Sequence, residues 1–337
     1  MKPTRPALRY HGGKWRLAPF LLQFFPAHRV YVEPFGGAAS VLMRKARSYA
    51  EVYNDLDDEV VSLFRVLRDD EAASRLKALL TLTPFARTEF EDAAVASDDP
   101  VERARRLIIR AFMGFGSNAH ASSCVAGKNG FRTYTSPDRE TDATGFRAYS
   151  GPERQALVEG KVHLGRVTGF RANSSRSGTT PATDWRNYPD ALEALVDRLR
   201  GVIIEHRDAL RVMAQHDGTS TLHYVDPPYV HSTRAPSNRY DLKYRMYRHE
   251  LTDAGHVALL EGLRGLSGMV VLSGYPCALY DEALADWASI ETQALADGAR
   301  KRTEVLWLNP ACSAALARLK HSTAGGEDMP LLSGAAI

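Results

Sequence analysis

The segment Asp226-Pro-Pro-Tyr229 has the residue types to hold a flat ring that carries an amino group. Pro227 and Pro228 fix two φ angles and cannot continue a strand, so a stiff turn follows the apolar run Leu222–Val225. Asp226 can accept one N–H of the amine, the Pro227 carbonyl can accept the other, and Tyr229 can stack on the ring. Accepting both hydrogens frees the nitrogen lone pair for an electrophile. The alternative is a strand-ending turn without chemistry.

A second candidate is the segment Val32-Glu-Pro-Phe-Gly-Gly-Ala-Ala-Ser40, which follows another short apolar run and opens a helix. Paired glycines let the backbone approach a ligand closely, and a helix N-terminus favours a negatively charged group. Asp55 follows the next apolar run and can pair with ribose hydroxyls, as an acid does in dinucleotide-binding folds. Alternatively, Asp55 caps the next helix, a role that Asp57 would fill equally well.

Two further segments combine basic and aromatic residues. Arg9-Tyr-His-Gly-Gly-Lys14 is either a glycine loop laid across a ligand, with Lys14 as a cation and Tyr10 as a lid, or a simple tail. In His231–Arg248 basic residues alternate with tyrosines, a pattern that can grip phosphates and stack on bases. A solvated loop with locally packed tyrosines is the alternative.

Charge is unevenly distributed along the chain. The net charge is only +3, but positions 100–190 hold fourteen basic and eight acidic residues. Such an arginine-rich excess suits a surface that meets phosphates, although an ordinary solvated face would look the same.

Several classes of protein are excluded. Three scattered cysteines are too few for a disulfide framework or a zinc site, and the histidines lack metal-ligand spacing, so we expect no metal. There is no Gly-x-Ser-x-Gly or Walker sequence. Without a secretory signal or an apolar run of about 20 residues, we expect no contact with a membrane and a cytoplasmic location.

Strand and helix patterns alternate through most of the chain, which predicts an α/β fold with a doubly wound, mostly parallel sheet. Ligands of such sheets bind at the carboxyl ends of the strands, where the candidate residues lie. The predicted strands are Val30–Glu33, Glu51–Tyr53, Val202–Glu205, Leu222–Val225, Met269–Leu272 and Glu304–Leu308. The predicted helices are Ala38–Ala46, Asp58–Arg68, Glu71–Leu80, Pro100–Met113, Tyr188–Arg200, Leu251–Arg264 and Tyr280–Asp286.

Taken in order, these motifs resemble those of the Dam-like (D12 class) adenine-specific DNA methyltransferases. The resemblance covers about 1–65 and 200–310, and rests on Tyr10-x-Gly-Gly-Lys14, Glu33-Pro-Phe-Gly-Gly37, Asn54-Asp55, Asp226-Pro-Pro-Tyr229, Leu272-Ser-Gly-Tyr275 and Lys301-Arg-Thr-Glu-Val-Leu-Trp-Leu308. One departure concerns Ala39, which stands where the family's Phe-x-Gly-x-Gly form has its second glycine. Because alanine is small, we expect binding to survive, with a shifted loop.

The resemblance implies a Rossmann-like, seven-stranded sheet that binds S-adenosylmethionine, leaves S-adenosylhomocysteine and needs no metal. It implies a catalytic domain of residues 1–68 and 190–320, a mostly helical or loop-like target-recognition insertion at 69–189 and a flexible tail at 321–337. The implied catalytic residues are Asp226, Pro227, Pro228 and Tyr229. The implied cofactor-binding residues are Tyr10, Lys14, Glu33, Pro34, Phe35, Gly36, Gly37, Asp55, Asp208 and Asp226. Arg9 is implied to touch DNA, and the basic–aromatic pattern adds Arg234, Arg239, Lys243, Tyr244 and Arg248.

The expected activity is therefore direct methyl transfer to the N6 amine of an adenine flipped out of double-stranded DNA. The rival enzyme activities are methylation of cytosine N4 and, less in keeping with the family, of RNA or a protein glutamine. A DNA-binding relative without catalysis is the rival of another class. We expect a bacterial or phage protein, monomeric or weakly dimeric, in a restriction–modification, phage or housekeeping setting.

Overall fold

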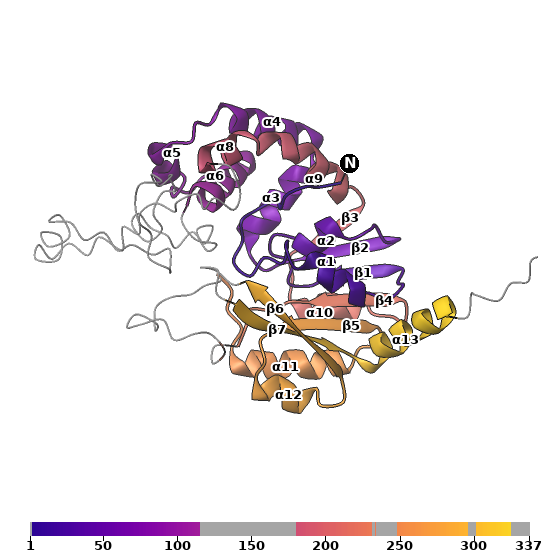
Figure 1. The fold of residues 1–337 in the computed structure, drawn as a ribbon. Coiled ribbons are helices and arrows are strands. Elements are labelled where there is room, and N and C mark those ends of the chain that lie inside the picture. Colours follow the sequence, from indigo (N-terminus) through magenta and orange to yellow (C-terminus); the bar gives the residue numbers. More distant parts are fainter. Residues whose placement is uncertain (1, 115–179, 231–232, 234–247, 296–300, 325–337) are drawn as a thin grey trace, which may run out of the picture.

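Seven strands form one sheet in the order β3-β2-β1-β4-β5-β7-β6 (Figure 1). The computed structural model describes residues 2–114, 180–230, 233, 248–295 and 301–324. Strands β1 to β5 pair in parallel, and β7 runs antiparallel between β5 and β6. This arrangement confirms the predicted Rossmann-like, seven-stranded α/β fold. The strands are β1 Val30–Glu33, β2 Ala50–Asn54, β3 Val202–Glu205, β4 Thr221–Val225, β5 Met269–Gly274, β6 Ala288–Leu295 and β7 Lys301–Leu308.

The sheet is apolar on both faces, and each face is covered by helices. Along β5, Val271 belongs to one buried cluster, whereas Val270 and Leu272 belong to another, because successive side chains of a strand point to opposite faces. The first face packs against α1 Ala18–Leu21, α2 Ser40–Arg44, α3 Asp58–Arg68, α9 Leu192–Leu199 and α13 Pro310–Ala324. The second packs against α10 Ala209–Gln215, α11 Asp253–Arg264 and α12 Ala278–Ala283.

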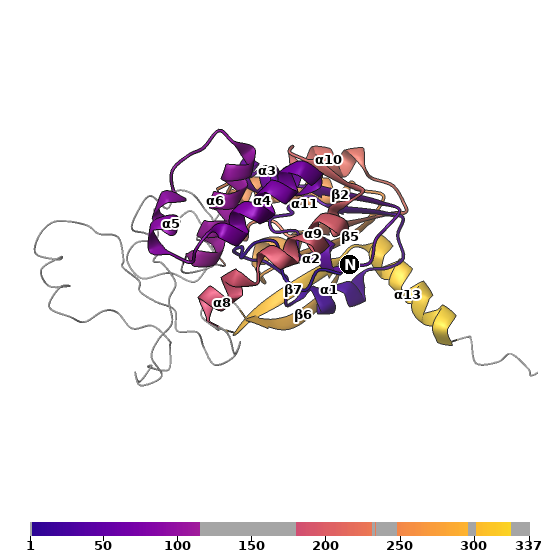
Figure 2. The same cartoon turned by 90° about the horizontal axis from the view of Figure 1, so that it is seen from above.

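The stretch between β2 and β3 adds a group of helices to the first face. These are α4 Asp70–Leu82, α5 Arg87–Asp92, α6 Pro100–Met113 and α8 Pro181–Arg186, followed by the 3-10 turn η2 Pro189–Ala191. Helix α6 contacts α3, α4, α5 and α8, and its apolar residues belong to the same buried cluster as the sheet. Figures 1 and 2 show this group at the opposite end of the molecule from α13.

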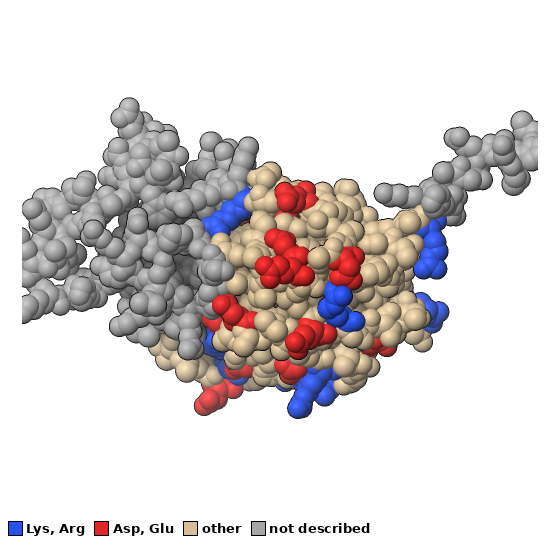
Figure 3. All heavy atoms as spheres, turned by 90° about the horizontal axis from the view of Figure 1, so that it is seen from below, with Lys and Arg blue, Asp and Glu red and all other residues tan. Residues whose placement is uncertain are grey.

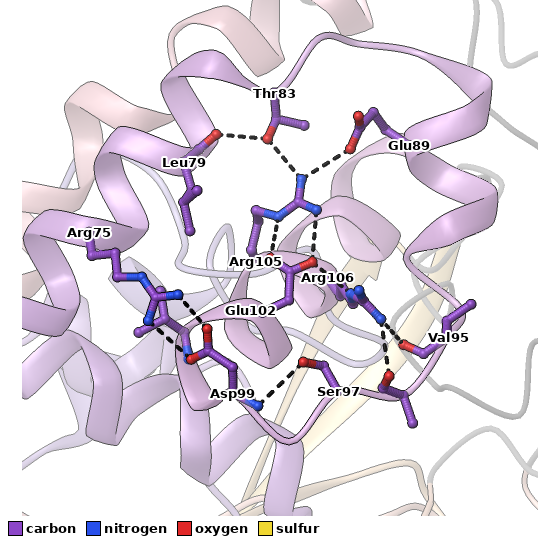
Figure 4. A network of polar contacts seen from close by, with 12 residues as sticks. Arg75, Leu79, Thr83, Glu89, Val95, Ser97, Asp99, Glu102, Arg105 and Arg106 are labelled. Carbon is purple, nitrogen blue, oxygen red and sulfur yellow. Dashed lines mark hydrogen bonds and ion pairs between the residues drawn. The ribbon is translucent and has the colours of Figure 1, made fainter.

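The arginines of α6 do not form a free basic surface. Glu102 accepts hydrogen bonds from Arg105 and Arg106, and Arg105 also reaches Glu89 of α5 and Thr83 after α4 (Figure 4). Arg106 donates to the carbonyl oxygens of Val95 and Ala96. In the described part of the arginine-rich stretch these side chains therefore tie helices together; residues 115–179 lie outside the described part.

The face that α11 and α12 cover offers no basic patch in the part of the chain that the structure describes. Figure 3 shows acidic side chains across the middle of the face turned downward in Figure 1, with basic ones scattered among and around them. Among the described residues, no helix has the length and apolarity needed to cross a bilayer.

Most of the predicted elements are present, but several observed elements were not predicted. These are the strand β6, the helices α1, α5, α8, α10 and α13, and the 3-10 turn η1 Leu22–Phe24. The predicted helix Tyr188–Arg200 opens with η2. Helix α13 runs to Ala324, beyond the predicted start of the tail at position 321. The remaining tail lies outside the described residues.

Candidate active site

The candidate residues meet at the carboxyl edge of the sheet. The glycine turn follows β1, Asp55 follows β2 and Asp226 follows β4, while β7 begins at this same edge because it runs antiparallel. One pocket there is lined by predicted residues from all three of the early motifs and from the proline turn. They are Tyr10, Lys14, Glu33, Pro34, Phe35, Gly36, Gly37, Asp55, Asp226 and Pro228.

Lys14 links the N-terminal loop to the proline turn. Its Nζ donates to both carboxylate oxygens of Asp226 at 2.8 Å and to the hydroxyl of Tyr229 at 2.5 Å. The side chain is only 7% exposed, so this ammonium is held in place by buried partners. The resemblance assigned Lys14 to the cofactor alone, whereas the geometry makes it a direct neighbour of the Asp226 carboxylate.

Burial sets the acidity of two carboxyl groups in the pocket. It raises the pKa of Asp226 to about 6; Lys14 opposes this shift and the charge of Glu304 adds to it. Burial likewise raises the pKa of Glu33 to about 8, although Tyr31 and the Leu42 amide donate hydrogen bonds to its carboxylate. At neutral pH, the Asp226 carboxyl group is therefore mostly ionised and accepts hydrogen bonds, whereas the Glu33 carboxyl group is mostly protonated.

Glu304 of β7 is part of the site, but it was not predicted as a site residue. Its Oε1 accepts hydrogen bonds from the Tyr229 hydroxyl at 2.6 Å and the Ser273 hydroxyl at 2.7 Å, and lies 3.4 Å from Lys14 Nζ. The sequence holds one signal for it: Glu304 is an acid directly before the apolar run Val305–Leu308. A buried acid in a strand needs partners, and these lie 31 and 75 positions away in the chain.

The glycine turn depends on close packing of aromatic rings. A Cβ atom on Gly36 would lie 2.1 Å from the ring of Tyr53, and one on Gly37 would lie 2.8 Å from the ring of Tyr10. Gly37 also has a positive φ of 47°. Side chains at these two positions would therefore displace the rings that line the turn.

Ala39 adopts the conformation that the family's second glycine would adopt easily. Its φ and ψ are 51° and 35°, in the left-handed region, and it is the one described residue other than glycine with a positive φ. The left-handed region is strained for a residue with a Cβ atom. The alanine is therefore accommodated in a strained, glycine-like backbone.

Asp55 holds the glycine turn through its carboxylate. Its two oxygens accept hydrogen bonds from the backbone N–H groups of Gly37, at 2.7 Å, and Asp57, at 2.8 Å. The cap of helix α3 is Asp57, which accepts from the N–H of Glu59. Asp55 lines the pocket, so its contact with ribose hydroxyls stays a prediction.

Several predicted residues lie apart from the pocket lining or outside the described residues. Asp208 is exposed and caps α10 by accepting from the N–H of Arg211; the pocket is lined by Ala209 instead. Arg9 and Pro227 are not among the lining residues. Their predicted roles remain untested. Arg234, Arg239, Lys243 and Tyr244 lie outside the described residues.

Two side chains that were predicted to contact DNA or its bases contact other residues of this protein. Arg248 was predicted to bind DNA, and its guanidinium forms ion pairs with Asp57, Asp58 and Glu59 at the start of α3. Tyr229 was predicted to stack on a base; its ring does not line the pocket, and its centroid lies 4.2 Å from that of Tyr275. The two rings are tilted by 50° and in contact in this structure.

Comparison with known proteins bears on the identity of this site. Residues 10–112 match the family model of the D12 class N6 adenine-specific DNA methyltransferases. The resemblance to this class is confirmed. The DNA adenine methylases of Escherichia coli K12 and O157:H7 are each 31% identical over 109 residues, which is 31% of this chain.

The matched region has a limited extent. The chain spans 39% of the length of these curated relatives. The region matched by the family model contains the glycine turn and Asp55 but ends before the proline turn. The proline turn therefore depends on the local geometry for its interpretation.

Proposed function

We propose that this protein is a DNA methyltransferase that transfers the methyl group of S-adenosylmethionine to the N6 amine of adenine. The observation that carries the proposal is that the Asp226 carboxylate and the glycine turn line one pocket. The match to the D12 class supports adenine rather than cytosine.

The residues of the pocket fit the methyl donor chemically. S-adenosylmethionine carries two positive groups, the sulfonium and the ammonium. The pocket contains the Asp226 carboxylate, which is mainly ionised at neutral pH, together with the carboxyl groups of Glu33 and Asp55, which can form hydrogen bonds. The glycine turn allows close approach of the backbone, as a tightly held cofactor needs. Among the described residues, no group of acids, histidines and cysteines is placed to hold a metal ion.

In the proposed reaction, Asp226 accepts one N–H of the adenine amine and the Pro227 carbonyl accepts the other. The amine nitrogen attacks the methyl carbon, a C–N bond forms, and the C–S bond breaks with its electron pair left on sulfur. The nitrogen then loses one proton, to the Asp226 carboxylate or to water. The protein contributes positioning and polarisation of the amine, which act without a covalent intermediate.

The target base must leave the double helix to reach a buried carboxylate. We propose that residues 1–68 and 190–320 form the catalytic domain and that the insertion at 69–189 meets double-stranded DNA. Within that proposed insertion, helix α6 packs against α4, α5 and α8.

The test is identification of the methylated nucleoside after incubation of DNA with labelled S-adenosylmethionine. We expect N6-methyladenine with the wild type and a fall in kcat of roughly 10²- to 10⁴-fold with Asp226→Ala. Cofactor binding should fall much less. The control is Asp281→Ala, since Asp281 is an exposed acid on α12. Detection of N4-methylcytosine would show that the target is the cytosine amine and not the adenine amine. Methyl transfer by Asp226→Ala at nearly the wild-type rate would refute the mechanism.

A further inference from the structure

Glu304 is a buried carboxylate on which three polar groups of the site converge. The residue is 2% exposed, and its Oε1 receives the hydroxyls of Tyr229 and Ser273 while lying 3.4 Å from Lys14 Nζ. These groups come from the proline turn, from β5 and from the N-terminal loop. A carboxylate so placed fixes three separate segments relative to one another.

Lys14 lies between the carboxylates of Asp226 and Glu304. In this structure both oxygens of Asp226 accept hydrogen bonds from Lys14 Nζ. An adenine amine that donates to Asp226 competes with those hydrogen bonds. A buried ammonium that loses one partner needs another, because an unpaired charge is costly inside a protein. Glu304 is the second carboxylate within reach of Lys14.

We infer that Glu304 is a positioning residue for the proposed methyl transfer. It orients Tyr229, and it holds Lys14 when the target amine replaces Lys14 as a hydrogen-bond donor to Asp226. This inference rests on the proposed function. Glu304 acts through Lys14 and Tyr229, and its carboxylate is covered by their side chains.

The charge of Glu304 also acts on the acidity of Asp226. Burial raises the pKa of Asp226, Lys14 lowers it, Glu304 raises it and the Ser273 hydroxyl lowers it. Loss of the negative charge at Glu304 therefore lowers the pKa of Asp226 and keeps its carboxylate ionised at lower pH. Among the described residues, further titratable groups that interact with Asp226 include Glu33 of β1, Tyr224 of β4, Tyr275 after β5 and Tyr280 of α12.

The experiment compares pH–rate profiles of the full-length wild type, Glu304→Gln and Glu291→Gln on DNA. For Glu304→Gln we expect kcat to fall roughly ten- to a hundredfold, as loss of a hydrogen bond to a charged group predicts. We also expect the acid midpoint to move to lower pH, with little change in the KM for S-adenosylmethionine. Glu291→Gln should match the wild type, because Glu291 is an exposed acid of the neighbouring strand β6.

A merely structural role would lower activity at every pH and leave the midpoint unchanged, and that result would overturn the inference. If Glu304→Gln does not fold, Glu304→Asp provides the test, because it keeps the charge but shortens the side chain. We expect Glu304→Asp to lower kcat with an unchanged midpoint, because the charge is kept, and with an unchanged KM for S-adenosylmethionine. Wild-type kcat, or a KM that rises as kcat falls, would overturn the inference. Failure of the wild type to methylate DNA would instead refute the proposed function.

Discussion

At the scale of single residues, the state of Asp226 depends on two opposing effects. Burial disfavours its charged form, and the Lys14 ammonium at 2.8 Å favours it. The result is a carboxyl group whose pKa is raised to about 6, close to the pH at which a cell operates. The site therefore combines low exposure to water with an acceptor that remains available at neutral pH.

This balance predicts the pH dependence of methyl transfer. Because Asp226 must be ionised to accept the amine, kcat should fall about tenfold per pH unit below a midpoint near pH 6. Lys14→Met removes the group that lowers this pKa, so the midpoint should move to higher pH. Lys2→Met, at an exposed position of the same segment, should leave the midpoint unchanged. An unshifted midpoint in Lys14→Met would show that Lys14 does not control Asp226.

The strain at Ala39 gives a prediction about stability. Left-handed backbone costs a residue with a Cβ atom about 1–2 kcal/mol, and glycine costs about 0.4–1 kcal/mol through the unfolded state. Ala39→Gly should therefore raise the free energy of unfolding by about 1 kcal/mol, measured by denaturant titration. Ala38→Gly, at a neighbouring buried position without a positive φ, should lower it. A loss of stability in Ala39→Gly would contradict the assigned backbone.

Residue types at strand ends were the part of the site that the sequence could predict. Glu33, Asp55 and Asp226 each follow an apolar run, and parallel pairing then brings the strand ends to one edge. The partner of each side chain was harder to predict. The contacts of Lys14 with Asp226 and of Tyr229 with Glu304 span 212 and 75 positions, and no local pattern encodes them.

At the scale of elements, Arg105 joins three helices of the group formed by α4, α5, α6 and α8. It bonds Glu102 of its own helix, Glu89 of α5 and Thr83 after α4, and is 18% exposed (Figure 4). Arg105→Met should lower the free energy of unfolding by about 1–2 kcal/mol and speed hydrogen exchange in α5.

The matched control is Arg75→Met, which removes an ion pair with Asp99 in the same group of helices. The Arg75 side chain is 56% exposed, and such surface pairs contribute about 0–1 kcal/mol. Equal losses of stability from the two substitutions would show that the buried network has no special role.

Two helices with strong apolar periodicity were predicted with accurate ends, and the exposed strand β6 was missed. Helices Asp58–Arg68 and Pro100–Met113 have the predicted bounds, because each buries one broad apolar face. Strand β6 was missed because it is an edge strand whose polar residues, including Ser289, Glu291 and Gln293, are exposed. This segment forms a strand because it pairs with β7, although its own sequence does not indicate a strand.

At the scale of the whole molecule, the stretch between β2 and β3 shares its core with the sheet. Strands β2 and β3 are neighbours in the sheet, although the helices from α3 to α9 separate them in sequence. Tyr188 donates to the Ala7 carbonyl, which ties the end of this stretch to the N-terminal segment that carries Lys14. The packing of this stretch was not predicted from the sequence, because it depends on side chains far apart in the chain.

The central claim is that the glycine turn and the proline turn form one site for the methyl donor and the target amine. The most direct measurement is a crystal structure of the protein with bound S-adenosylhomocysteine. We predict that the ligand lies against residues 33–37 and Asp55 with its sulfur directed toward Asp226. A ligand bound elsewhere, or bound with its sulfur directed away from Asp226, would contradict the account.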